Sequence, residues 1–152
     1  MAIKRVAILM QIDTGDKENP SATTRADVLE NGIQVEGADE TYMIYVNDSH
    51  SPGRPGKPNK QAMLNSAAHE LGHVLSSAFK VSGGMHEDPR TMREFVGMGS
   101  LHEIRVRSTD EQKKRIHSNE TLAWELAKKI RPEITDKQAQ ESLDTYKWAK
   151  TA

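Results

Sequence analysis

The sequence predicts an α+β domain in which a short mixed β-sheet packs against two long helices, with a third helix near the carboxyl end. Three observations favour this fold class. Short runs rich in Val, Ile and Tyr lie in the first 47 residues, a segment after residue 60 repeats apolar residues every three or four positions, and two helix-capping patterns follow residue 107. The length of 152 residues suits one domain, so we expect residues 1–152 to share one core.

The composition argues against several classes of protein. Lys and Arg number 21 against 22 Asp and Glu, so no overall field draws the chain to nucleic acid or to a membrane surface. The absence of cysteine excludes disulfides, cysteine-based zinc sites and thiol catalysis, and it agrees with a reducing compartment. The apolar run at residues 6–10 is too short for a signal sequence, and no run approaches the ~20 apolar residues of a membrane helix. We therefore expect a soluble, cytoplasmic protein.

The amino-terminal third predicts strands around one short helix. Residues 4–12 are typical of a buried strand that ends at a polar turn, and residues 21–30 of a short helix. Residues 33–35 and 41–47 then predict two strands joined by a hairpin turn at 36–40. In the second of these strands, one face carries the side chains of Tyr42, Ile44 and Val46.

The middle of the chain predicts a loop followed by the strongest helix. Residues 48–60 contain three prolines and two glycines, which favour a loop. Residues 61–80 predict a helix, and the pair Gly83 and Gly84 follows its end. Its apolar stripe consists of Leu64, Ala67, Ala68, Leu71, Val74, Leu75 and Ala78. Residues 85–107 show no periodicity, and we expect this irregular segment to border a cleft.

Two capping boxes predict where the helices of the last third begin. In the first, Ser108 is the cap and Glu111 lies three residues on, so a helix should run to residue 130, with a break near His117. In the second, Thr135 and Gln138 hold the same positions. One side of the final helix carries Ala139, Leu143 and Tyr146.

The central helix carries the pattern of a zinc site. Residues 69–73 are His-Glu-Leu-Gly-His, an H-E-x-x-H motif. Residues four apart on a helix lie about 40° apart around its axis, so the imidazoles of His69 and His73 project together and can bind one Zn²⁺. Zinc lowers the pKa of its water toward ~7, and Glu70 is placed to take that proton as a general base. Gly72 costs about 1 kcal/mol of helix propensity, which indicates that another segment packs closely there.

A catalytic zinc site needs a third protein ligand, and the residues alone leave several candidates. A metzincin site would place its ligand six residues after the second histidine, with a glycine midway, but Phe79 and Ser76 occupy these positions. That class is therefore excluded. His86 and His102, both in the irregular segment, could complete a three-histidine site. The remaining option is a glutamate on a second helix.

One later segment resembles such a helix. Residues 119–127 are Asn-Glu-Thr-Leu-Ala-Trp-Glu-Leu-Ala, which resembles the glutamate-bearing helix of gluzincins, where Asn-Glu begins the motif. The alanines three and seven residues after Glu120, with Pro132 beyond, resemble more closely the ImmA/IrrE family of small metallopeptidases. In that family a short strand ending near Val-Asn precedes the zinc helix, as residues 45–47, Tyr-Val-Asn, do here. About half of the chain takes part in the resemblance.

The resemblance implies a zincin-like domain and assigns its site. The implied zinc ligands are His69, His73 and Glu120, and the implied general base is Glu70. Trp124 stands where the family has an asparagine, the separation of the histidines from the glutamate is longer than in the family, and Glu125 is a rival ligand. Gluzincins also supply a His or Tyr to the developing oxyanion, for which the candidates are His86, His102, His117 and Tyr146.

We therefore expect a zinc metallopeptidase that hydrolyses peptide bonds, and the resemblance implies a specific regulatory protein as its substrate. If residues 42–47 form an edge strand beside the zinc, an extended peptide could pair with them. The alternative is a zinc-containing regulatory or protein-binding module without proteolytic activity. The balanced charge disfavours nucleic-acid binding, for which the basic residues would be Arg54, Lys57, Lys60, Lys113, Lys114 and Arg115. The oligomeric state is left open.

Overall fold

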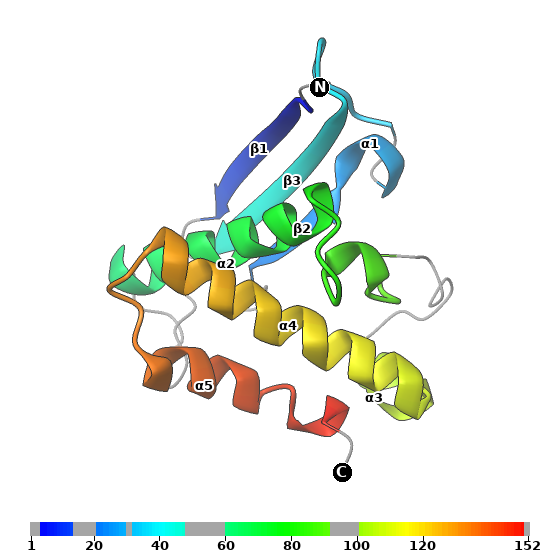
Figure 1. The fold of residues 1–152 in the computed structure, drawn as a ribbon, viewed down its shortest axis with the longest axis vertical. Helices are drawn as coiled ribbons and strands as arrows, with labels where there is room; N and C mark the ends of the chain where they lie inside the picture. Colours follow the sequence, from blue (N-terminus) through cyan, green and yellow to red (C-terminus); the bar gives the residue numbers. More distant parts are fainter. Residues whose placement is uncertain (1–3, 14–20, 30–31, 48–59, 92–100, 151–152) are drawn as a thin grey trace.

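A computed structural model describes residues 4–13, 21–29, 32–47, 60–91 and 101–150 (Figure 1). The strands are β1 (Val6–Asp13), β2 (Ala22–Arg25) and β3 (Glu40–Asn47). The α-helices are α1 (Ala26–Leu29), α2 (Lys60–Ala78), α3 (Leu101–Arg107), α4 (Asp110–Ile130) and α5 (Asp136–Asp144), and the short 3₁₀ helices are η1 (Met85–Glu87) and η2 (Lys147–Ala149).

The fold has mixed α and β elements, as predicted, and stacks them in layers (Figure 1). In the described part of the chain the strands form one sheet of order β1-β3-β2, in which β1 runs parallel and β2 antiparallel to β3. Helix α2 lies between this sheet and α4, and α5 lies on the far side of α4. This order places the H-E-x-x-H helix at the centre of the molecule.

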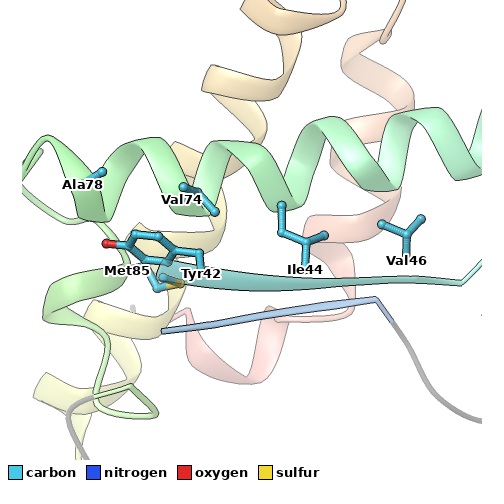
Figure 2. Close-up of a cluster of buried hydrophobic side chains, with 6 residues drawn as sticks. All are labelled: Tyr42, Ile44, Val46, Val74, Ala78 and Met85. Atoms are coloured by element: carbon cyan, nitrogen blue, oxygen red, sulfur yellow. The ribbon is translucent and has the colours of Figure 1, made fainter. Parts of the chain in front are cut away.

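The main core lies between β3 and α2 (Figure 2). Tyr42, Ile44 and Val46 point from one face of β3 toward the helix and are at most 1% exposed, which confirms the predicted face. Their partners on α2 and η1 are Val74, Ala78 and Met85. Alternate side chains of a strand share a face, so this one apolar face fixes the position of α2 on the sheet.

The prediction for residues 33–47 is wrong in its pairing. Residues 33–35 are not a strand, and no hairpin joins them to β3. Strand β3 pairs instead with β1 on one side and β2 on the other, so it is the middle strand and not an edge. The turn itself is present, because Ala38 donates a backbone hydrogen bond to Val35 and Gly37 has a φ of 83°.

The helix predicted at 21–30 is also wrong in its first half. Ala22–Arg25 is strand β2, and only Ala26–Leu29 is helical. The sequence Ala-Thr-Thr-Arg has no apolar alternation, so its extended form comes from pairing with β3 rather than from local pattern.

Strand β1 follows the prediction for residues 4–12 in position but not in burial. It lies at the edge of the sheet, and Ile8, Met10 and Ile12 are 40%, 47% and 48% exposed. Their register partners Tyr42, Ile44 and Val46 are buried beneath α2, which packs mainly on β3, and the β1 residue that packs against this core is Val6.

The helical predictions fare better. Helix α2 matches the predicted segment within two residues. Helix α4 runs through His117 without a break, and its capping box joins Thr109 to Gln112, one residue later than the predicted pair. The second capping box, Thr135 with Gln138, is confirmed.

Two further expectations need correction. The irregular segment 85–107 contains η1 and α3, so it is partly helical. Tyr146 lies beyond the end of α5 and packs near Ile116 on α4, whereas Ala139 and Leu143 pack near Trp124. Residues 48–59 of the predicted loop lie outside the described residues. None of the helices that the structure describes is both long and apolar enough to cross a bilayer.

Candidate metal centre

The site forms where α2 and α4 pack unusually close together. A Cβ atom placed on Gly72 would lie 2.4 Å from the backbone oxygen of Ala123, which is too close for any side chain. Gly72 therefore lets the two helices approach at this level, as the sequence indicated. Ala123 is itself fully buried. This contact brings the α4 side chain one turn earlier, Glu120, over the two histidines of α2.

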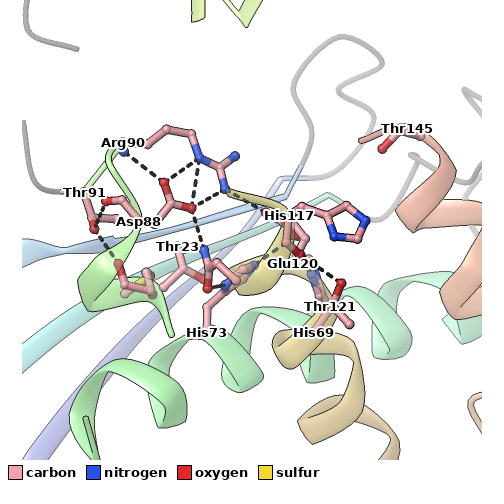
Figure 3. A network of polar contacts seen from close by, with 12 residues as sticks. Thr23, His69, His73, Asp88, Arg90, Thr91, His117, Glu120, Thr121 and Thr145 are labelled. Atoms are coloured by element: carbon pink, nitrogen blue, oxygen red, sulfur yellow. Dashed lines mark hydrogen bonds and ion pairs between the residues drawn. The ribbon is translucent and has the colours of Figure 1, made fainter. Parts of the chain in front are cut away.

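Glu120 contacts both imidazoles of the motif (Figure 3). Its Oε2 atom lies 3.0 Å from Nε2 of His69 and 3.4 Å from Nε2 of His73. All three residues are buried, with exposed fractions of 9%, 5% and 3% for His69, His73 and Glu120. Two nitrogens from α2 thus lie beside one carboxylate oxygen from α4, although Glu120 is more than 40 residues from either histidine in the sequence.

Two spacings in this cluster are close to those of a tetrahedral zinc site. With bonds of 2.0–2.1 Å, the ligand atoms of a tetrahedral site lie about 3.3–3.4 Å apart. The two distances from Glu120 to the imidazole nitrogens are 3.0 Å and 3.4 Å, close to that spacing. His69, Glu70 and His73 also offer one donor atom each within 4.8 Å of one another. The set contains only nitrogen and oxygen donors, which zinc accepts.

Glu70 approaches the same histidines from a different direction than Glu120. Its Oε1 lies 3.3 Å from Nδ1 of His69, on the opposite ring nitrogen from the one that meets Glu120. Its Oε2 accepts a hydrogen bond of 2.5 Å from the hydroxyl of Thr23 on β2. Glu70 is thus anchored on the side of His69 opposite Glu120, and it also belongs with His69 and His73 to the group that could hold a metal.

A chain of hydrogen bonds orients both His73 and Glu120 (Figure 3). Nδ1 of His73 lies 3.1 Å from Oδ1 of Asn119, whose amide nitrogen donates to Asp88 at 2.6 Å. Because an amide oxygen only accepts, Nδ1 carries the proton and leaves the Nε2 lone pair for an ion. Arg90 donates to Asp88 at 2.5 Å and to Oε1 of Glu120 at 3.0 Å. Such outer contacts fix ligand orientation in metal sites.

The other imidazole is held by stacking. The His69 ring lies 4.4 Å from the Trp124 ring, centroid to centroid, at an angle of 15° between planes. Trp124 is 7% exposed, so the pair is shielded from solvent. Trp124 is the residue that replaces the asparagine expected from the resemblance, and the stack gives it a role in placing His69.

The two carboxylates of the site stabilise a positive charge on the His69 imidazole. Burial alone would lower the pKa of His69, but Glu120 and Glu70 outweigh it and raise that pKa to about 10. Burial would likewise raise the pKa of Glu120, yet His73 and His69 hold it well below the usual range. The pKa of Glu70 is also lowered, because His69 outweighs the effect of burial. Both carboxyl groups are therefore ionised at neutral pH.

The rival ligands do not reach this point. Glu125 is exposed and lines a pocket of about 260 Å³ with Lys128 and Asp136. His102 is exposed on α3, and His86 on η1 faces Glu87 at 3.7 Å. Of the oxyanion candidates, Tyr146 is tied to the site through Arg90, whose guanidinium carbon lies 5.6 Å from the tyrosine ring centre.

Comparisons with models of protein families, with curated proteins and with solved structures were made for the whole chain. None of the three found a match. The assignment of the site therefore depends on its own geometry.

Several residues of the site were missed from the sequence. Thr23, Asp88, Arg90 and Asn119 each bind a motif residue or its partner directly. Asn119 carried a signal, because it precedes the ligand glutamate in the motif that resembles gluzincins. Thr23, Asp88 and Arg90 carried no such signal in the sequence, since they lie in short segments whose contacts depend on the tertiary fold.

Proposed function

We propose that this protein is a zinc-dependent metallopeptidase that hydrolyses peptide bonds. The observation that carries the proposal is the position of Glu120, whose Oε2 lies between the Nε2 atoms of His69 and His73. The ion would be held by these three residues. An open fourth position for water or substrate distinguishes a catalytic zinc site from a structural one, and three protein ligands are consistent with it.

Each group near the ion would have a separate task. A bound zinc ion supplies Lewis acidity, which brings the pKa of a water molecule close to neutral. Glu70 takes the proton from the attacking water and passes it to the leaving amine. Its low pKa and its bond from Thr23 keep it ionised and oriented for the first transfer. Tyr146 is the candidate donor to the developing oxyanion, since burial raises its pKa to about 12 and it keeps its proton.

The sheet offers a place for an extended substrate. Strand β2 is the outer strand on the side of the site, and its Thr23 contacts both the backbone oxygen and the side chain of Glu70. A peptide added alongside β2 would run past the general base, which is the usual way a protease aligns its substrate. The resemblance to the ImmA/IrrE family favours a specific regulatory protein over general peptides.

The decisive experiment separates metal binding from catalysis. The purified protein should contain about one zinc per chain. Glu70→Gln should keep this zinc and lose peptide hydrolysis by at least about 10²-fold, because the base is removed and the ligands are not. Glu120→Ala should lose both. Elemental analysis and a peptide-library assay measure the two quantities.

The outcomes distinguish the alternatives. A native protein without zinc would overturn the proposal. A zinc-loaded protein that cuts no peptide library and no candidate protein, and whose in vivo function survives Glu70→Gln, would be a zinc-containing binding module instead. Glu125→Gln serves as the matched control, since it removes an exposed carboxylate from the same helix.

A further inference from the structure

Among the described residues, the outer edge of β1 pairs with no other strand. Ile8, Met10 and Ile12 form a continuous apolar strip on one face, each between 40% and 48% exposed. From Val6 to Ile12 the strand contains no charged residue and no proline. Proteins commonly protect sheet edges with charges, prolines or bulges, because an unprotected edge pairs with another strand. This edge therefore favours a partner.

The backbone of β1 has a defined outward side. The carbonyl of Arg5 accepts hydrogen bonds from the amides of Asp39 and Glu40, so it points toward β3. Alternate residues of a strand in a parallel pair point their N–H and C=O groups toward the neighbour. The odd-numbered residues thus face β3, and the even-numbered ones, Val6 to Ile12, present theirs to the outside.

The sequence of this edge is complementary to itself. If a second β1 ran antiparallel with Leu9 opposite Leu9, Ile8 would lie opposite Met10 and Val6 opposite Ile12. At the two ends, Arg5 of each copy would lie opposite Asp13 of the other, so opposite charges close the pairing. The even residues would form the hydrogen-bonded pairs, in agreement with the outward side of the backbone.

We propose that two copies of this chain associate through antiparallel pairing of their β1 strands, centred on Leu9. The two sheets then form one continuous sheet across a two-fold axis, an isologous interface. Ile8, Met10 and Ile12 of one copy then pack against the same residues of the other copy, on the face of the sheet that carries α2. Because the order is β1-β3-β2, strand β2 lies at the opposite edge of each sheet from the proposed interface.

Cysteine cross-linking tests the register directly, because the chain has no cysteine of its own. Leu9→Cys should form an intermolecular disulfide on mild oxidation, since opposite residues of a non-hydrogen-bonded pair have Cα atoms about 4.5 Å apart. Ala7→Cys is the matched control: its two copies would lie four residues apart along the strand, about 13 Å, and should stay unlinked. Equal cross-linking of both variants would overturn the proposed pairing.

Association in solution provides an independent test. Sedimentation of the full chain should show a concentration-dependent dimer. Met10→Lys and Arg5→Asp should each weaken this dimer by at least about tenfold, because each places an unfavourable charge at the interface. The double variant Arg5→Asp with Asp13→Arg should restore it. Val106→Lys, which also places a lysine at an exposed apolar position, should have no effect. A monomer throughout the micromolar range would overturn the proposal.

Discussion

One hydrogen bond decides which nitrogen His73 could present to an ion. His73 offers Nε2 because Asn119 accepts the proton of Nδ1, and Asn119 keeps that orientation because its amide group donates to Asp88. Asp88, which does not contact the imidazole, thus helps to fix the orientation of His73 through Asn119. Outer contacts of this kind are worth as much to a metal site as many direct ones.

The first prediction tests this contact. Asn119→Leu keeps the branched shape and the number of heavy atoms of the side chain but removes both hydrogen bonds, so zinc affinity should fall about 10- to 100-fold. A competition titration against a chelator measures it. Glu125→Gln on the same helix should leave the affinity unchanged. An unchanged affinity in the leucine variant would mean that the Asn119 contact does not position His73.

The second prediction concerns the Trp124 stack on His69. Trp124→Ala should lower the free energy of unfolding by about 3–5 kcal/mol, because a large buried ring leaves a cavity. Trp124→Phe should cost less, since it keeps a ring beside the imidazole, and the indole Nε1 has no hydrogen-bond partner among the described residues. Urea unfolding of both variants provides the measurement. Equal losses would show that ring stacking is unimportant.

At the scale of elements, the closest contact is between α2 and α4. It joins the backbone oxygen of Ala123 to the α-carbon region of Gly72, so no rotamer change could relieve a larger residue there. The distance between the two helices also sets the distance from Glu120 to both imidazoles. Helix packing and metal geometry are therefore coupled at one residue.

The third prediction follows from this coupling. On helix propensity alone Gly72→Ala would stabilise α2 by about 1 kcal/mol. The clash with Ala123 should reverse the sign, so we expect a net loss of about 1–3 kcal/mol and weaker zinc binding. Thermal unfolding of the zinc-free protein and zinc titration check the two effects. A stabilised variant that binds zinc normally would contradict the close contact.

The elements that the sequence predicted well are those whose pattern is local. Helix α2 has an apolar stripe of its own, and the second capping box consists of neighbouring residues. Strand β2 has neither, because Thr23 and Thr24 favour caps and strands alike, and only pairing with β3 decides between them. The first capping box shifted by one residue because Ser108 and Thr109 are both favourable caps, and each has a suitable partner three residues on.

The site divides in the same way. His69, Glu70 and His73 lie within one helical turn, so their spacing alone predicted a shared site, and the structure brings them together. The third candidate ligand is 47 residues beyond His73, and no spacing rule could choose among the glutamates and histidines in that interval. The resemblance favoured Glu120, which the fold places against both imidazoles.

For the whole molecule, an ion at this centre would hold β2, α2 and α4 together. A ligand that binds only the folded state stabilises it, by about 2.7 kcal/mol at a free concentration 100 times its dissociation constant. The fourth prediction is that zinc raises the midpoint of thermal unfolding and that chelation reverses the shift. In Glu120→Ala the shift should be much smaller. A zinc-independent midpoint in the native protein would contradict the assignment.

The fifth prediction concerns alkaline pH. Burial under α2 raises the pKa of Tyr42 from 10.0 to about 12. The Glu40 carboxylate adds to this rise, whereas the hydrogen bond with Ser77 acts in the opposite direction. The folded state thus keeps a proton that the unfolded chain releases above pH 10. The stabilisation is present below that pH and is lost as pH rises toward 12. Tyr42→Phe should show a shallower fall in unfolding free energy over this interval. Equal slopes would contradict the shift.

The contacts from His73 through Asn119, Asp88 and Arg90 to Glu120 return to His73, because Glu120 itself meets that imidazole. A closed circuit of this kind has two routes between any two members. If one of these contacts is lost, His73 and Glu120 are still connected through the remaining contacts. If two are lost, part of the network no longer contacts the rest. Combining Asn119→Leu with Arg90→Met should therefore lower zinc affinity by more than the product of the two separate fold-decreases.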